Sequence, residues 1–271
     1  MEIKKSLFKI CLAFSWIAIL LASCKKDNQS SSTDLPVVQA YLYVGHTLTV
    51  KLYQQKSLTD TAKYGAAITG QVLYVSDGSN QVKLTESAKG TYTYNDNAFL
   101  TAGKTYTLSF NYLSKEVTAK TIMPSKPQNF ATQHTTVIYT RPTNVNVTSD
   151  TLNRFTWDNP DSLNHVLVFD NVDDTFIALG RATGFSNSNS NIFEMNTDRK
   201  SAYYVVSNSF PYYGTYQVIL LRVNQEYINL IESNILNANS QNLLNVPTNV
   251  VNGLGIFTAM QADTLSFSLA D

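Results

Sequence analysis

The sequence has 271 residues with 20 basic and 20 acidic side chains, so its net charge is zero, and 44% of its residues are hydrophobic. Nucleic-acid binding needs a basic surface that displaces counterions, and this composition does not provide one. The two cysteines, Cys11 and Cys24, lie near the N-terminus. The rest of the chain therefore has no thiol for a disulfide, a metal or a nucleophile.

An export signal occupies residues 1–23. Three lysines precede the apolar stretch 10–21, and small residues follow it, which is the layout of a signal peptide. The apolar stretch is shorter than the roughly 20 residues of a membrane-spanning helix. The run from Leu21 to Cys24 has the pattern of a lipoprotein signal, which predicts cleavage before Cys24 and acylation at that residue. The protein is therefore expected to be held to a membrane through its lipidated N-terminus.

Residues 24–35 form a predicted tether, because this polar stretch has too little apolar surface to fold. As a flexible chain it reaches roughly 15–20 Å, enough to hold a globular body just clear of the lipid headgroups. Lys25 stands where many inner-membrane lipoproteins carry an aspartate, so the outer membrane is the expected destination. The pair Lys26-Asp27 resembles part of the surface-export signal of Bacteroidetes lipoproteins, which favours the cell surface over the periplasmic side.

Short segments of alternating hydrophobicity begin at Val37. In Thr105–Tyr112, for example, aromatic and aliphatic residues alternate with Thr, Ser and Asn, which indicates a half-buried strand. The pair Asp77-Gly78 between two such segments is a hairpin signal. The predicted strands are 37–43, 47–53, 71–76, 82–86, 90–94, 105–112 and 117–122. Seven short strands within residues 36–124 predict an immunoglobulin-like β-sandwich domain.

Pro124 and Pro127 mark a predicted domain boundary, because proline ends strand pairing and stiffens the chain. Residues 128–271 form a second predicted β-rich domain, in which Phe155–Pro160 resembles the second strand of fibronectin type III modules. Its predicted strands are 137–139, 154–157, 166–169, 176–179, 192–195, 203–206 and 215–223. Apolar residues at helical spacing near 224–238 predict one helix, either packed on the sandwich or binding a partner. The expected fold class is mainly β, with two sandwich domains and one helix.

Several short motifs together resemble a known family. They are the strand Val38–Leu42, the turn Gly90–Tyr92, the strand entry Gly103–Tyr106, the segment Thr121–Pro124 and the terminal run Asn252–Phe257. With the lipoprotein signal, they resemble an uncharacterised Bacteroidetes lipoprotein family catalogued as domain of unknown function 4249 (DUF4249). Members are typically encoded near TonB-dependent outer-membrane receptors, so the resemblance implies an accessory role beside such a transporter. Gly253 and Gly255 indicate a chain reversal or a close backbone approach.

No sequence pattern points to catalysis, so the protein is predicted not to be an enzyme and to need no cofactor or metal. His46, His134 and His165 lack the spacing of paired metal ligands. The acidic group at 170–174 matches no EF-hand loop. Residues 184–188 lack the second glycine of a nucleophile elbow. A carboxylate pair of the kind that glycosidases use stays open as an alternative.

Aromatic residues gather between positions 203 and 216. Tyrosine presents a flat apolar face with a polar tip, which suits binding surfaces and stacking on sugars. The cluster consists of Tyr203, Tyr204, Phe210, Tyr212, Tyr213 and Tyr216. It predicts a platform for a ligand or partner, with packing in the core as the alternative.

Four Asp residues followed by Ser or Thr and then a small or aliphatic residue resemble the O-glycosylation acceptor motif of exported Bacteroidetes proteins. The acceptor hydroxyls would be those of Thr61, Thr151, Ser162 and Thr264. The leading functional hypothesis is a non-enzymatic outer-membrane lipoprotein that serves a TonB-dependent transporter as an accessory or binding subunit. The alternative is a surface glycan-binding or adhesive module that uses the tyrosine cluster.

Overall fold

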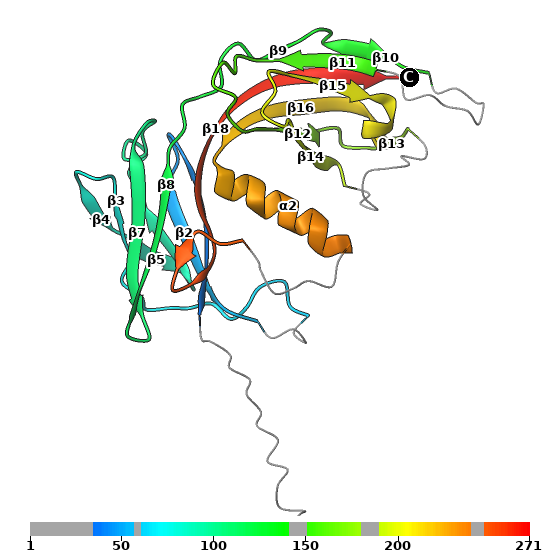
Figure 1. The fold of residues 1–271 in the computed structure, drawn as a ribbon. Coiled ribbons are helices and arrows are strands. Elements are labelled where there is room, and N and C mark those ends of the chain that lie inside the picture. The colour runs from blue at the N-terminus through cyan, green and yellow to red at the C-terminus, as the bar shows by residue number, and fades with distance from the viewer. Residues whose placement is uncertain (1–34, 57–60, 141–150, 180–189, 240–246) are drawn as a thin grey trace, which may run out of the picture. The chain divides into compact units, whose positions relative to one another are not determined.

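Strands make up most of the body in the computed structural model (Figure 1). The structure describes residues 35–56, 61–140, 151–179, 190–239 and 247–271. The strands are β1 Pro36–Tyr43, β2 Leu48–Gln54, β3 Tyr74–Ser76, β4 Gln81–Lys83, β5 Thr85–Ala88, β6 Thr91–Tyr94, β7 Thr105–Tyr112, β8 Lys115–Ile122, β9 Ala131–Thr132, β10 Thr136–Ile138, β11 Thr151–Thr156, β12 His165–Asn171, β13 Ile177–Ala178, β14 Ile192–Asn196, β15 Ala202–Val206, β16 Tyr212–Val223, β17 Val250–Val251 and β18 Leu254–Ala270. A short 3-10 turn covers Ser207–Ser209, and helix α2 covers Gln225–Asn239. Within these described ranges, no helix is long and apolar enough to cross a membrane.

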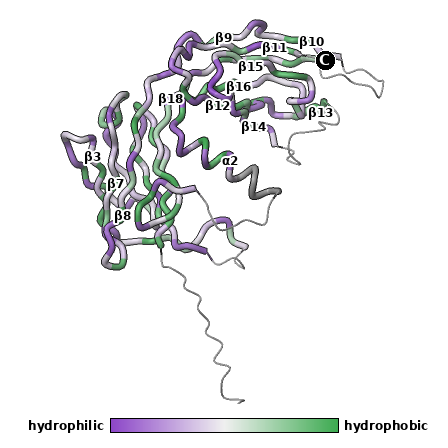
Figure 2. The backbone as a smooth tube through the Cα atoms, in the orientation of Figure 1, coloured by the Kyte–Doolittle hydropathy of each residue, from purple (hydrophilic) through white to green (hydrophobic). Residues whose placement is uncertain are grey.

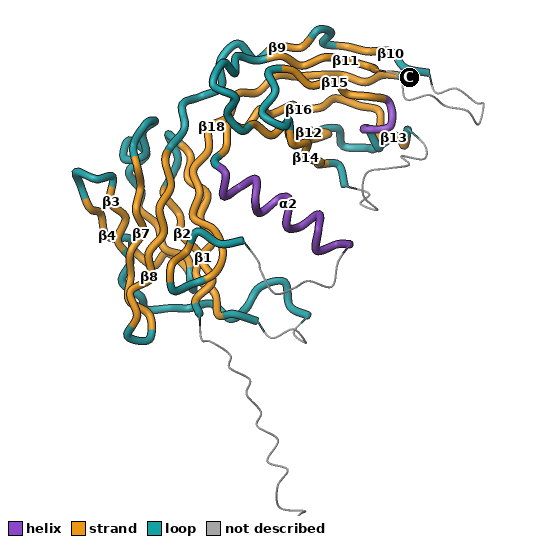
Figure 3. Tube along the Cα trace, viewed as in Figure 1, coloured by secondary structure: helices purple, strands orange, loops and turns teal. Residues whose placement is uncertain are grey.

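The described strands form three sheets, which Figure 3 shows in orange. The largest has the order β14-β12-β16-β18-β1-β2-β6-β5, and β10 and β13 pair with β18 and β16. A second sheet has the order β17-β8-β7-β3-β4, and a third has the order β15-β11-β9. The second sheet packs on the β1 side of the large sheet and the third packs on its β12 side, because each pair shares a hydrophobic core.

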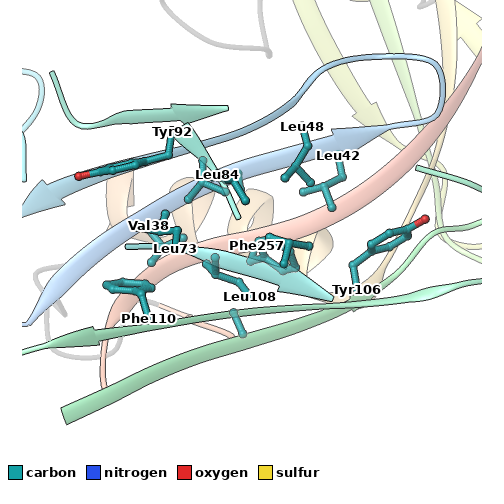
Figure 4. Close-up of a cluster of buried hydrophobic side chains, with 14 of the residues drawn as sticks. Val38, Leu42, Leu48, Leu73, Leu84, Tyr92, Tyr106, Leu108, Phe110 and Phe257 are labelled. Atoms are coloured by element: carbon teal, nitrogen blue, oxygen red, sulfur yellow. The ribbon is translucent and has the colours of Figure 1, made fainter. Parts of the chain in front are cut away.

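The first core lies between the large sheet and the β7–β8 sheet. Along β1, Val38, Ala40 and Leu42 are buried and the intervening residues are more exposed, which is the period of two expected for a strand with one face on a core. Hydrophobic and hydrophilic residues alternate similarly along neighbouring strands (Figure 2). Figure 4 shows how Val38 and Leu42 meet Phe257 of β18 and Leu108 of β7.

The second core lies between the large sheet and the β11 sheet, and helix α2 covers the opposite face of the large sheet. Strand β12 shows why both faces are covered, since five consecutive residues from His165 to Phe169 are buried. Leu167 and Phe169 point into the second core, whereas Val166 and Val168 belong to the cluster that includes Ile228 of α2. This segment therefore has hydrophobic residues on both faces, as expected for a strand between two layers.

Helix α2 begins at a polar network that joins it to two strands. The Asn224 side chain donates hydrogen bonds to Thr121 Oγ1 of β8 at 2.9 Å and to the Ala259 carbonyl of β18 at 3.2 Å. The Glu226 carboxylate accepts hydrogen bonds from Thr121 at 2.7 Å and from Thr258 at 3.2 Å. Buried polar groups are stable when they are paired in this way, so the network fixes the start of the helix to β8 and to the first part of β18.

Strand β18 belongs to both cores. Its first part pairs in parallel with β1, from Val37 opposite Leu254 to Tyr43 opposite Met260. Its later part pairs antiparallel with β16 up to Leu269. Phe257 lies in the first core and Phe267 in the second, so a single strand carries side chains of both.

The mainly β fold with one helix confirms the prediction made from the sequence. Two details differ. The segment predicted as a single strand at 82–86 is two strands, β4 and β5, in different sheets, with the buried Leu84 between them. No strand was predicted over residues 254–270. The five residues from Ile256 to Met260 are all buried, so this segment does not show the alternation of buried and exposed residues from which the other strands were predicted. The division into domains at 124–128 stays a prediction. In the structure, β17 and the first part of β18, which come from the C-terminal part of the sequence, complete the first sandwich.

Gly255 meets the backbone of β1 so closely that it has no room for a side chain. Its φ is +94°, and a Cβ built there would lie 2.0 Å from the Val38 carbonyl oxygen. This confirms the close backbone approach predicted for the glycine pair. We expect Gly255→Ala to lower the free energy of unfolding by about 3 kcal/mol, since left-handed strain and a clash add together.

Gly45 provides a matched control for that substitution. Its φ is +80°, but a Cβ there would meet nothing within 4 Å. Gly45→Ala should therefore lower the free energy of unfolding by only about 1 kcal/mol, from backbone strain alone. Urea unfolding of both variants measures the difference. Equal losses would show that the β1–β18 contact does not limit stability.

Candidate functional site

Two tyrosines lie on the outer face of β1. Because Val38, Ala40 and Leu42 point into the core, residues at the odd positions point away from it, and these include Tyr41 and Tyr43. Both rings are half-buried. The Tyr43 hydroxyl group lies 2.7 Å from the sulfur of Met260 on the neighbouring strand β18. Aromatic rings therefore cover this part of the large sheet, on the side opposite the first core.

Helix α2 contributes a third tyrosine beside these two. Tyr227, in the first turn of α2, meets Tyr41 edge to face with ring centroids 6.3 Å apart. The Tyr227 hydroxyl group donates to the carboxylate of Glu194 on β14, at 3.4 Å from each oxygen. We call Tyr41, Tyr43, Tyr227 and Glu194 the tyrosine face. Its three rings pack against the hydrophobic cluster under α2, and their hydroxyl groups and the Glu194 carboxylate add polar groups beside them.

The tyrosine face holds its phenols in the neutral form. Burial raises the pKa of Tyr41 and of Tyr43 above the ordinary value. Burial also raises the pKa of Tyr227, and the neighbouring Glu194 charge adds to this effect. Loss of surrounding water raises the pKa of Glu194 in turn. At neutral pH these tyrosines act as hydrogen-bonding and stacking groups, because ionised phenols are not formed there.

The aromatic cluster predicted at 203–216 does not form a single surface. Phe210 is 1% exposed and Tyr216 is fully buried, so the prediction that they belong to a ligand platform was wrong. Both pack in the second core, where their ring centroids lie 5.1 Å apart. The alternation of β16 places Tyr216 on the same inward side as Val218 and Leu220. Packing in the core accounts for these two rings.

The other members of the cluster lie at different places. Tyr203 is partly buried against the second core, and its hydroxyl group lies 3.0 Å from the sulfur of Met195. Tyr213 also packs on that core and donates to the Tyr139 carbonyl at 3.0 Å. Tyr212 is half-buried and its ring contacts that of Phe176. Tyr204 is 57% exposed and lies under the Arg154 guanidinium group, 5.5 Å from ring centroid to Cζ.

The predicted modification positions fall on both described and undescribed parts of the chain. Cys24 lies outside the described residues. The four candidate acceptors Thr61, Thr151, Ser162 and Thr264 are all exposed. Thr151 and Thr264 lie in strands β11 and β18, whereas Ser162 lies in a turn with φ of +50°. Glycosylation of these hydroxyls stays a prediction.

His165 is the histidine that the structure places inside the body. It is fully buried at the start of β12, and its ring centroid lies 5.8 Å from that of Trp157. Burial lowers the pKa of His165 to about 4. The imidazole is therefore neutral at physiological pH, and its Nδ1 lies 3.1 Å from the Leu163 carbonyl. Among the residues that the structure describes, no group of three potential ligands could hold a metal ion.

Sequence reasoning missed the tyrosine face, although one signal for it was present. Once the even positions of the first strand were assigned to the core, Tyr41 and Tyr43 had to point outward together. Strand alternation could not show that Tyr227 and Glu194 lie beside these two tyrosines. Their approach depends on the path of α2 across the large sheet and on the pairing of β14 with β12.

The chain belongs to the family described as Domain of unknown function (DUF4249), whose model matches residues 26–266. This confirms the resemblance found from the short motifs. No curated protein matches the chain.

Three solved structures are similar to the chain at low identity. The chicken CNTN1 FN1–FN3 domains are 11% identical with a TM-score of 0.29, over 88% of this chain and 65% of that one. A chimeric titin Z1Z2 carrying a KLER peptide from decorin is 11% identical with a TM-score of 0.21, over 88% and 98%. Trypsin-activated alpha-2-macroglobulin from Escherichia coli is 12% identical with a TM-score of 0.20, over 70% and 14%. The chain thus spans 65% of the length of the CNTN1 structure.

Proposed function

We propose that this protein is a non-enzymatic lipoprotein of the outer membrane, held by acyl chains on Cys24, with the cell-surface side favoured over the periplasmic side. The observation that carries the proposal is the lipoprotein signal from Leu21 to Cys24, followed by a polar tether that ends where β1 begins. Several acyl chains on one residue give stable membrane attachment, whereas a single chain gives only marginal binding. The body then supplies binding surfaces close to the membrane.

The partner in this proposal is a TonB-dependent transporter, which the protein would serve as an accessory or binding subunit. The chain belongs to the DUF4249 family, and the support for this role is that members of the family are typically encoded near such receptors. Several polar groups of the body are engaged in stabilising the fold. Asp77 accepts a hydrogen bond from Lys104 at 2.6 Å and from two backbone amides in the β3–β4 turn, and Thr121 and Glu226 fix the start of α2.

Substitution of the acylated residue tests the proposal directly. In a Bacteroidetes host, the unmodified chain should sediment with outer membranes and carry an N-terminal mass increase from acyl groups. Cys24→Ala should carry no acyl mass and should be released from the membranes by a high-salt wash, because its acyl anchor is removed. Ser23→Ala keeps a small residue in the signal and should behave like the unmodified chain. An unmodified N-terminus on a freely soluble protein would contradict the proposal.

Co-purification tests the proposed partner. Gentle solubilisation of the same membranes should yield the protein together with a TonB-dependent receptor. If the protein always elutes without a receptor, this would argue against that partner.

A second candidate function is glycan binding, and the tyrosine face is the observation that favours it. Tyr41 and Tyr227 present rings at right angles, with the Glu194 carboxylate next to them. Sugar rings have apolar faces that stack on aromatic rings and hydroxyl groups that bind carboxylates. This surface replaces the cluster at 203–216 as the proposed platform.

Variants of the tyrosine face test this second function by affinity electrophoresis in gels containing polysaccharides. Tyr41→Ala and Tyr227→Ala should each weaken retention about tenfold, because a stacked ring contributes roughly 1–1.5 kcal/mol beyond its buried area. Tyr41→Phe keeps the ring and should retain most of the binding. Tyr204→Ala removes an exposed tyrosine on a different sheet and should have no effect. No retention of the unmodified protein on any polysaccharide would end this proposal.

A further inference from the structure

Several segments gather at the end of the first sandwich where the chain enters β1. Pro36 pairs with Gln54 at the end of β2. A Cβ on Gly253, in the turn before β18, would lie 3.1 Å from the Pro36 carbonyl oxygen. The adjacent Asn252 donates to the Glu116 carbonyl at 2.8 Å, next to the β7–β8 turn. We call this end of the sandwich the tether end (Figure 1).

Leu113 occupies an unusual position at the tip of the β7–β8 turn. It is 63% exposed, and both it and Ser114 have positive φ angles, 46° and 65°. Two-residue hairpin turns of this kind favour Asn-Gly, because other residues are strained in the left-handed region. An exposed leucine in this conformation contributes little packing to offset the strain. Such departures from local preference are expected where a residue serves a function.

Lysines lie at the same end of the sandwich as this turn. Lys115 follows the turn directly. Lys89 precedes Gly90, and the Gly90 carbonyl accepts a hydrogen bond from the Leu52 amide, which places Lys89 near the end of β2. Lys63 lies over the ring of Tyr64 at 5.4 Å, and Tyr64 stacks on Tyr53 of β2.

Lys56 adds a fourth basic group at this end, just after β2. The acidic side chains described there are Glu86 and Glu116. The Glu86 oxygens accept hydrogen bonds from the Gly70 and Gly90 amides, so its charge is partly satisfied within the fold. The described residues of the tether end therefore present both an excess of positive charge and an exposed apolar tip.

We propose that the tether end rests on the membrane surface, with Leu113 inserted among the lipid headgroups and the lysines of this end bound to anionic lipid phosphates. Pro36 lies 12 positions after Cys24, and the tether predicted from the sequence would reach roughly 20 Å as a random coil. A lipid anchor on Cys24 therefore keeps this end of the body near the lipid, at an effective concentration that makes a weak contact significant. Lysines near an anionic surface and apolar side chains in the headgroup region both favour such a contact. In the cell, this contact rests on the proposed function, because it assumes that acyl chains on Cys24 hold the protein at the membrane.

Vesicle flotation of the mature chain, residues 24–271 with Cys24→Ala, tests the contact without any acyl group. We expect binding to vesicles of phosphatidylglycerol and phosphatidylethanolamine, weakened by salt, and much weaker binding to phosphatidylcholine. The double variant Leu113→Asn, Ser114→Gly should bind about tenfold more weakly, since it removes the apolar tip. The same change supplies the preferred turn residues, so its melting temperature should stay equal or rise, which separates lost binding from misfolding.

Three further variants complete the test. Lys63→Glu should weaken binding severalfold, whereas Lys200→Glu, in the turn between β14 and β15, should not. Ile138→Ser removes a side chain that is 75% exposed beside Ala270, at the opposite end of β18, and should bind like the parent. The proposal is overturned if the parent does not bind the anionic vesicles, or if the Leu113 double variant binds as well as the parent. Failure of acylation in cells would overturn the proposed anchor but would leave these results unchanged.

Discussion

The parallel pairing of β1 with β18 is the constraint on which the rest of the structure depends. It joins the strand nearest the N-terminus of the body to the strand that ends the chain. The contact is close enough that Gly255 lies directly against the Val38 carbonyl. Because β18 continues into its pairing with β16, the two cores are built on one uninterrupted strand. Contacts between residues so distant in sequence are expected to slow folding, since a long loop must close before they form.

Helix α2 reinforces this arrangement from the other face of the large sheet. Its first turn is fixed by Asn224 and Glu226 to Thr121 of β8 and to β18, and Ile228 packs on buried residues of β12 and β16. The same turn carries Tyr227 next to Tyr41. The position of the tyrosine face therefore depends on the junction between the two halves, and a ligand there would contact β1, α2 and β14 together.

Local patterns predicted much of this fold, and long-range contacts account for what they missed. Strands such as Thr105–Tyr112 have one buried face, so their alternation is visible in the sequence. Residues 256–260 of β18 are buried on both faces, which removes that signal. For the candidate site, aromatic residues near one another in sequence were a poor guide, because strand alternation sends Tyr216 inward and Tyr204 outward. The tyrosine face joins residues from three distant segments, and only the tertiary fold brings them together.

Hydrogen exchange along β18 tests most directly the claim that one strand unites the two cores. The account predicts that amides from Ile256 to Phe267 in the core of β18 open together with those of β1 and β16, with a single free energy close to that of global unfolding. A contrary result would be two separate classes, in which the residues paired with β1 exchange at a different opening free energy from those paired with β16. The two halves would then be independent domains joined by a shared chain segment.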